Sequence, residues 1–97
     1  MYNYTITHNE KEQRFETVID GEKAFLEYRF YKSDIAMMHT FVPEQLGGKG
    51  VASALAKYAL EYAKAQNLPV MVYCPFVGAF LKRHPEYNVL LDKKYQK

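Results

Sequence analysis

The residues best placed for chemistry are three glycines, Gly47, Gly48 and Gly50, at the point where an apolar segment gives way to a helical pattern. Because glycine has no side chain, a ligand can approach the backbone closely there. The first N–H groups of the helix that follows have no partner within the helix and lie at the positive end of its dipole. Such a turn can also be a plain flexible loop, but three glycines at this junction favour an anion site, most often for a phosphate.

The spacing of these glycines does not meet two common phosphate motifs. A P-loop needs Gly-x-x-x-x-Gly-Lys-Ser/Thr, whereas here Pro43 stands at the first glycine position and Gly50 follows Lys49, which leaves no hydroxyl for Mg²⁺. A dinucleotide fingerprint needs Gly-x-Gly-x-x-Gly or Ala, but the pattern that starts at Gly48 reaches Ser53 instead. The loop therefore favours neither a nucleotide triphosphatase nor a dinucleotide enzyme.

His39 is a candidate general base. It lies shortly before the turn, and strict strand alternation places it on the same face as Met37 and Phe41. A histidine on an apolar face is often a core residue bonded to a backbone carbonyl. Near a ligand loop, imidazole can instead take a proton from an ammonium group near neutral pH. Both interpretations stay open.

Cys74 is a candidate reactive thiol because it directly precedes Pro75 at the start of a short helical pattern. A helix N-terminus stabilises a thiolate over a thiol. The alternative is a small buried hydrophobe, which is the usual state of a free cysteine. His84 is expected to cap the short helix rather than to catalyse. The histidines and the cysteine show no metal-ligand spacing.

The segments before the glycines alternate as strands do. Apolar and polar side chains alternate over 14–19 and over 23–31, with the hairpin signal Asp20-Gly21 between them. Residues 35–42 are apolar on both faces, as in a strand covered on both sides. We expect a meander of three antiparallel strands, preceded by a stretch (2–13) that is either an edge strand or a disordered lead-in.

The segments after the glycines predict helix, strand and helix. Residues 48–66 have helical periodicity, and their sheet-facing stripe consists of Val51, Leu55, Ala59 and Tyr62. Residues 70–74 form a short apolar run, so a parallel pairing with a right-handed crossover follows. Because ligands bind outside the carboxyl ends of such strands, Cys74 is expected near the ligand. The last helix spans 76–83, with Phe76, Val77, Phe80 and Leu81 on its apolar face.

The glycine loop fits the pattern Gln-x-x-Gly-x-Gly in Gln45-Leu46-Gly47-Gly48-Lys49-Gly50. This resembles the acetyl-CoA pyrophosphate loop of the GNAT acyltransferase superfamily. His39-Thr40-x-Val42-Pro43 before it, and Cys74-Pro75-Phe76-Val77 with Arg83-His84-Pro85-Glu86-Tyr87 after it, are similar to the short YjdJ-like branch of that superfamily. The resemblance covers about residues 14–91. One departure is Gly47, where this branch often has an arginine that would be a phosphate cation.

The resemblance implies an α/β (α+β) fold: a twisted, mostly antiparallel sheet with one parallel βαβ pair, one long helix and short C-terminal helices. It implies an N-acetyltransferase that uses acetyl-CoA or coenzyme A as co-substrate, without a metal. His39 and Cys74 become the catalytic candidates, Cys74 as acyl acceptor or thiolate-side acid, while Lys82 and Arg83 could reach the phosphates. The expected cofactor-binding residues are Phe41, Val42, Gln45, Leu46, Gly47, Gly48, Lys49, Gly50, Val51, Ala52 and Ser53.

Composition sets the remaining expectations. The 97 residues predict a single domain, with 48% hydrophobic content for its core. The lone cysteine fits a reducing cytoplasm, and neither a signal peptide nor a membrane span is expected. The net charge of +2 is scattered and does not favour nucleic acid.

Three classes of function stay open from the sequence. The first is acetyl transfer to an amine acceptor, which could be a polyamine, an amino sugar or a protein terminus. A non-catalytic CoA or acyl-CoA-binding module is the alternative. A tyrosine-rich nucleic-acid binder is a third class, and its affinity would fall steeply with salt. The oligomeric state is not readable from the sequence.

Overall fold

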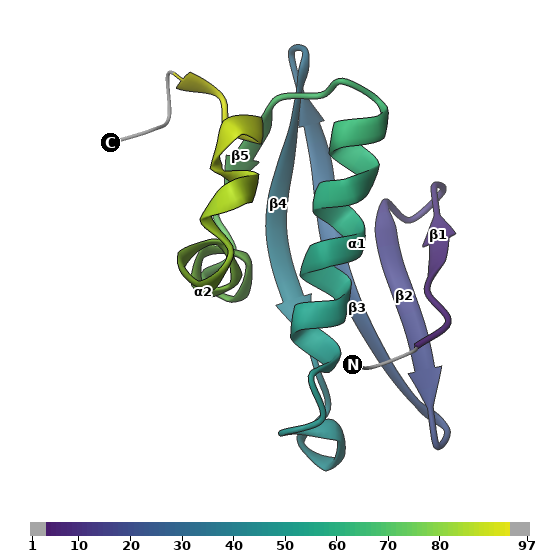
Figure 1. Ribbon diagram of the computed structural model, residues 1–97. Coiled ribbons are helices and arrows are strands. Elements are labelled where there is room, and N and C mark those ends of the chain that lie inside the picture. The colour runs from purple at the N-terminus through teal and green to yellow at the C-terminus, as the bar shows by residue number, and fades with distance from the viewer. Residues whose placement is uncertain (1–3, 94–97) are drawn as a thin grey trace.

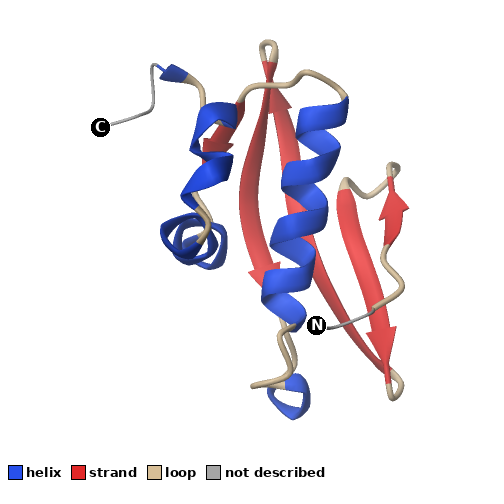
Figure 2. Ribbon diagram, in the orientation of Figure 1, coloured by secondary structure: helices blue, strands red, loops and turns tan. Residues whose placement is uncertain are grey.

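The computed structural model describes residues 4–93, which form one sheet with helices packed on one side (Figures 1 and 2). Five strands lie in the order β1-β2-β3-β4-β5. They are β1 Thr7–Asn9, β2 Arg14–Ile19, β3 Glu22–Tyr31, β4 Asp34–Phe41 and β5 Val70–Val72. The helices are α1 Val51–Ala65 and α2 Pro75–Arg83, with the 3₁₀ turns η1 Glu44–Leu46 and η2 Pro85–Leu90.

The sheet confirms the expected topology. Strands β1 to β4 pair antiparallel, and β4 pairs parallel with β5 through the α1 crossover. The stretch before residue 14, for which two states were open, contributes the edge strand β1. The alternation expected for β2 is confirmed, because Phe15 and Thr17 are buried while Val18 is exposed.

The core lies between the sheet and the two helices. The predicted stripe of α1 faces it, with Val51, Leu55 and Ala59 fully buried or nearly so. Ala56 and Ala63 are also fully buried. Their small side chains allow α1 to pack close to the sheet. The apolar face of α2 joins the same core through Val77, Phe80 and Leu81. Figure 1 shows α1 in front of the sheet and α2 beside β4, below β5.

The expectation that residues 35–42 are covered on both faces is wrong for their second part. Ile35, Ala36 and Met37 are buried, whereas Met38 and Phe41 are 39% and 45% exposed. The reason is that α1 and α2 pack on the same face of the sheet. The opposite face, here called the open face, is covered by no helix within residues 4–93.

A β-bulge interrupts β4. Glu27 pairs with His39 and Tyr28 pairs with Met37, so Met38 is an extra residue with no partner on β3. Because side chains alternate along a strand, one inserted residue moves every later side chain to the other face.

The bulge decides where His39 points. The alternation that placed His39 with Met37 is wrong, because Met37 faces the helices while His39 and Phe41 lie on the open face. There, the rings of His39 and Phe41 lie 6.3 Å and 5.6 Å from the ring of Phe25. Thr40 turns the other way and is 4% exposed.

The two parallel strands part soon after they meet. Their register ends at Met37 opposite Val72, and the N–H groups of Tyr73 and Cys74 both donate to the Met37 carbonyl. Beyond this point β4 continues, whereas the chain leaves β5 to begin α2 at Pro75. Along residues 4–93, no helix is long and apolar enough to cross a membrane.

Candidate functional site

A hollow of about 300 Å³ lies where β4 leads through η1 into α1. The expected cofactor-binding residues that line it are Val42, Leu46, Gly47, Gly48, Gly50, Val51, Ala52 and Ser53. Phe41, Gln45 and Lys49 were also expected at the ligand and are not part of this lining. Pro43, Glu44 and Phe76 complete it.

The N-terminus of α1 faces this hollow with unused donors. Gly50 is the N-cap, and its carbonyl accepts the first helical bond, from the Ala54 N–H at 3.0 Å. The N–H groups of Val51, Ala52 and Ser53 therefore precede the first helical donor, and within the described chain no side chain caps them. Unsatisfied N–H groups at the positive end of a helix dipole attract an anion.

Two of the three glycines are required by the backbone. Gly48 and Gly50 have φ of +77° and +75°, in the left-handed region that favours glycine. Turns of this kind point successive N–H groups to one side and form concave anion sites. Gly47 is different, since its φ of −62° suits any residue. A Cβ there would lie 3.2 Å from the Glu44 carbonyl oxygen.

Helix α2 completes the site with an aromatic ring and a cation. Phe76 was expected on the buried face of α2, and this is wrong, because Phe76 is 50% exposed and lines the hollow. It takes this position in the first turn, beside the glycine loop and outside the core. At the other end of α2, Arg83 donates from Nη2 to Ser53 Oγ at 3.1 Å. Arg83 was predicted as a residue that could reach the phosphates, and the bond places its guanidinium at the first turn of α1.

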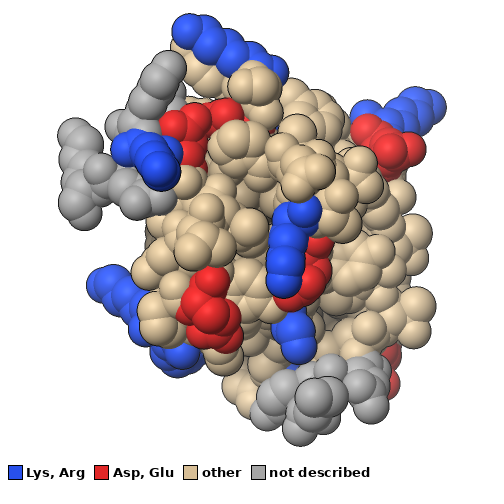
Figure 3. Space-filling view, turned by 45° about the horizontal axis from the view of Figure 1, so that its top comes forward, with Lys and Arg blue, Asp and Glu red and all other residues tan. Residues whose placement is uncertain are grey.

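The loop lysine lies elsewhere. Lys49 Nζ is 3.9 Å from Asp20 Oδ2 in the β2–β3 turn, and the Lys49 carbonyl accepts a hydrogen bond from Tyr4. Neither Lys49 nor Arg83 is part of the hollow's lining, but Arg83 adjoins it through its bond to Ser53. Figure 3 shows basic and acidic side chains interspersed over the face that it presents, without a large area of one sign.

A hydrogen bond holds the corner that carries Arg83. Tyr87 of η2 donates its hydroxyl to the Glu61 carboxylate of α1. This bond, with a smaller contribution from burial, raises the pKa of Tyr87 from 10.0 to about 12. His84 ends α2 as expected, with its N–H donating to the Phe80 carbonyl and its ring stacked on Phe80 at 4.3 Å.

Cys74 lies on the helix side of the place where β4 and β5 part. As expected, it is the N-cap of α2 and precedes Pro75. Its side chain is 1% exposed, and Sγ lies 3.0 Å from Thr40 Oγ1. The thiol therefore has a polar partner within the core and is closed to solvent.

His39 and Cys74 lie on opposite sides of the sheet. The bulge exposes His39 on the open face, whereas Cys74 belongs to the core between sheet and helices. Since β4 passes between them, the structure does not bring the two catalytic candidates together as a pair. Each flanks the end of the β4–β5 pairing from its own side.

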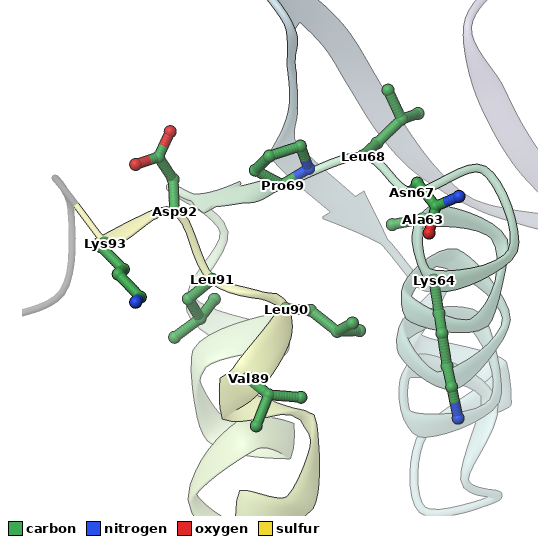
Figure 4. Close-up of a pocket in the computed structure, with 10 residues that line it drawn as sticks. All are labelled: Ala63, Lys64, Asn67, Leu68, Pro69, Val89, Leu90, Leu91, Asp92 and Lys93. Atoms are coloured by element: carbon green, nitrogen blue, oxygen red, sulfur yellow. The ribbon is translucent and has the colours of Figure 1, made fainter.

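A wider hollow of about 540 Å³ lies at the opposite end of α1 (Figure 4). Ala63 and Lys64 of α1 line it together with Leu90 and Leu91 after α2. At 1.5 Å per residue, the length of α1 separates it from the glycine loop by about 20 Å.

In the part of the chain that the structure describes, no group of three or more His, Cys, Asp or Glu side chains is arranged to hold a metal ion.

The chain is similar to several known proteins. It is 31% identical to protein NATD1 of Danio rerio over 87 residues, which cover 84% of this chain and 79% of that protein. It is 30% identical to protein NATD1 of Bos taurus, covering 82% and 74% of the two chains. The solution structure of a GCN5-like protein from Staphylococcus aureus matches with a TM-score of 0.71 and 30% identity, covering 95% of this chain and 91% of that one.

The family match covers most of the sheet and both helices. Residues 14–90 match the family described as GCN5-related N-acetyl-transferase. They include the glycine loop, the place where β4 and β5 diverge, and both ends of α2. The chain belongs to the GCN5-related N-acetyltransferase family.

Proposed function

We propose that this protein transfers the acetyl group of acetyl-CoA to an amine. The observation that carries the proposal is the row of N–H groups at the start of α1, which no side chain of residues 4–93 caps, beside Arg83 and Phe76, in a chain of the GCN5-related family. In this proposal the hollow holds the CoA pyrophosphate on the N–H groups of residues 50–53. The ring of Phe76 packs against the apolar part of the cofactor, and Arg83 faces its negative charge.

The chain's own residues have separate roles in the proposed transfer. The pantetheine arm lies where β4 and β5 part, with Thr40 and Cys74 along the core side. His39 takes the proton that the ammonium group must lose before the amine attacks. A backbone N–H near Phe41–Val42 stabilises the oxyanion of the tetrahedral intermediate, since a fixed donor is most effective where charge develops. Holding thioester and amine together lowers the barrier further.

The test of the ligand site is a charge placed at the start of α1. Ala52→Glu adds a carboxylate to the first turn, which stabilises the helix by about 0.3–1 kcal/mol but repels a pyrophosphate. We expect calorimetry to show acetyl-CoA binding by the wild type and at least tenfold weaker binding by Ala52→Glu. Ala52→Gln is the control of equal size, with binding close to that of the wild type. Equal affinities for all three proteins would contradict the loop assignment.

A non-catalytic CoA-binding module is the second candidate. One observation favours it: within residues 4–93, no hydrogen bond orients the exposed His39 ring, whereas general bases are usually held by a partner. Release of free CoA thiol, measured with acetyl-CoA and a panel of amines, separates the two candidates. Turnover that depends on the amine supports the transferase, and tight binding without turnover supports the module.

A further inference from the structure

The open face carries its own hollow beside the place where β4 and β5 part. It has a volume of about 420 Å³ and spans three strands. Its lining residues are Arg29, Phe30, Tyr31, Ala36, Met38, Met71 and Tyr73. Ala36 pairs with both Arg29 and Met71, so these three residues form one row across β3, β4 and β5.

The floor of this hollow is buried and its rim is aromatic. Ala36 and Met71 are each 3% exposed, although no helix within residues 4–93 covers them. Tyr31 and Tyr73 are more than half exposed at the rim. Exposed aromatic rings around a closed apolar floor give a flat organic body a surface to stack on.

The charge of the hollow has one sign. Arg29 is the only charged residue in its lining among the residues described. One Arg29 nitrogen, Nη1, donates to the Tyr28 carbonyl at 2.7 Å, and Nη2 lies 3.9 Å from the Glu27 carboxylate. A guanidinium has five N–H donors, so donors remain for a second carboxylate. The Arg29 side chain is 51% exposed and accessible from solvent.

The hollow borders the proposed reaction centre. Met38 and Tyr73 are the first residues beyond the last β4–β5 pair, Met37 opposite Val72. His39 follows Met38 and is exposed on this face. An amine at the Met38–Tyr73 edge would therefore lie next to the candidate base and next to the thioester, while the rest of its molecule covers Ala36.

We propose that this hollow binds the acceptor, and that the acceptor is an apolar or aromatic amine bearing a carboxylate, of the apolar α-amino acid class. The inference rests on the proposed acetyl transfer. The acceptor ammonium gives one proton to His39, its nitrogen forms a bond to the thioester carbon, and the carbon–sulfur bond breaks. The second nitrogen proton is released, the CoA thiolate takes up a proton, and N-acetyl product and CoA leave.

The lining argues against the two other small-molecule classes. A polyamine brings a second ammonium group, which Arg29 repels. The described lining has no carboxylate for it, and the neighbouring Glu27 is already paired with Arg29 and Arg14. An amino sugar would bury hydroxyl groups against methionine and aromatic carbon without partners, which costs about 1–3 kcal/mol per group. An apolar amino acid suits both the cation and the apolar floor of the hollow, because its carboxylate can lie near Arg29 while its side chain covers Ala36.

The experiment compares two amines that differ in a carboxylate. Phenylalanine and phenethylamine share a ring and a primary amine, so thiol release with each measures the effect of the carboxylate. We expect kcat/KM about tenfold higher for phenylalanine, the size of one charge-assisted hydrogen bond. Arg29→Gln should abolish this preference. Lys23→Gln, which removes a cation from the same face of the same strand, should keep it. Spermidine and glucosamine should be poorer substrates than phenylalanine.

Further readouts separate this inference from the proposed function. Acetyl-CoA binding is measured first by calorimetry, and its absence in the wild type would overturn the proposed function. If acetyl-CoA binds, phenylalanine should shift the methyl resonances of Met38 and Met71, and the spectra of both variants should show that they are folded. A wild type that binds acetyl-CoA but prefers spermidine, glucosamine or phenethylamine overturns the acceptor inference alone. So does a wild type that shows no methyl shift with phenylalanine, or an Arg29→Gln variant that keeps the preference.

Discussion

At the scale of single residues, the bulge at Met38 has the largest consequence. It turns His39 toward solvent on the open face and Thr40 toward Cys74 in the core. Two neighbouring residues of β4 therefore serve opposite sides of the sheet. A general base that takes a proton from an incoming amine must be reachable from solvent, and the exposed His39 meets that condition.

His39→Ala is expected to lower turnover at neutral pH while changing the acetyl-CoA dissociation constant by no more than a few-fold. The side chain is exposed, so the stability should change by less than about 0.5 kcal/mol. Thiol-release kinetics and calorimetry measure the two effects separately. His84→Gln, which changes a histidine at the end of α2, is the control. Unchanged turnover of a folded His39→Ala protein at every pH would leave His39 without a role in proton transfer.

Cys74→Ser is expected to retain substantial activity. The thiol is 1% exposed and already bonded to Thr40, so direct transfer with Cys74 beside the pantetheine fits better than an acyl-enzyme. Intact mass after incubation with acetyl-CoA alone should show no added acetyl group on the wild type. A single acetyl group on Cys74 that an amine discharges would instead establish a two-step route with ping-pong kinetics.

At the scale of elements, the site is made where α1 and α2 approach each other. Their ends meet through the Arg83–Ser53 bond and through Phe76 beside the glycine loop. The loop itself holds two glycines at positive φ and one, Gly47, in an ordinary conformation. Of these three glycines, only Gly47 has a φ that another residue adopts readily.

Gly47→Arg is expected to strengthen CoA binding by about 2- to 10-fold, the effect of one partly exposed cation worth about 0.5–1.5 kcal/mol. The Cβ would lie 3.2 Å from the Glu44 carbonyl, so the loop must yield by a few tenths of an ångström. Gly47→Gln is the control of similar length without the charge. Calorimetry at two salt concentrations should show that the gain shrinks as salt rises. A gain that Gly47→Gln shares would not be electrostatic.

The contact between η2 and α1 is expected to weaken at high pH. Tyr87 is neutral when it donates to Glu61, and its pKa is raised from 10.0 to about 12. A raised pKa means that the bond stabilises the fold fully below pH 10 and that this stabilisation is lost between pH 10 and 12. We expect Tyr87→Phe to have a lower melting temperature than the wild type at pH 8 and an equal one near pH 12. A difference that persists at pH 12 would assign the effect to packing.

At the scale of the whole molecule, one core supports both helices and the sheet. Leu55 of α1 is fully buried in it, and Leu55→Ala should lower the free energy of unfolding by about 2–5 kcal/mol. Because total stability is about 5–15 kcal/mol, this is a large fraction. Urea unfolding measures it, with the exposed Val89→Ala as control. Added CoA should raise the melting temperature of Leu55→Ala, since a ligand that binds the folded state stabilises it.

The order of β2 to α2 and the position of the glycine loop could be predicted from the sequence alone. Alternation identified β2 and β3, and helical periodicity identified the buried stripe of α1. The glycines before a helical pattern identified the turn, and Pro75 identified Cys74 as the residue before a helix. These signals are local, because each depends on residues within a few positions of one another. Eight of the residues expected to bind the cofactor line the hollow, because they are neighbours in the sequence around the glycine turn.

The face of the sheet on which each candidate residue lies became clear from the three-dimensional structure. The bulge at Met38 depends on pairing with β3, and a period of two cannot detect one inserted residue, so His39 was placed on the wrong side. Phe76 fits an apolar helix face in sequence, but only its neighbours Cys74 and Val77 are buried in the core, while the Phe76 ring lies at the hollow beside the glycine loop. The hollow around Ala36 and the Arg83–Ser53 bond join segments far apart in the chain. Their geometry depends on how helices and strands pack, which no local pattern records.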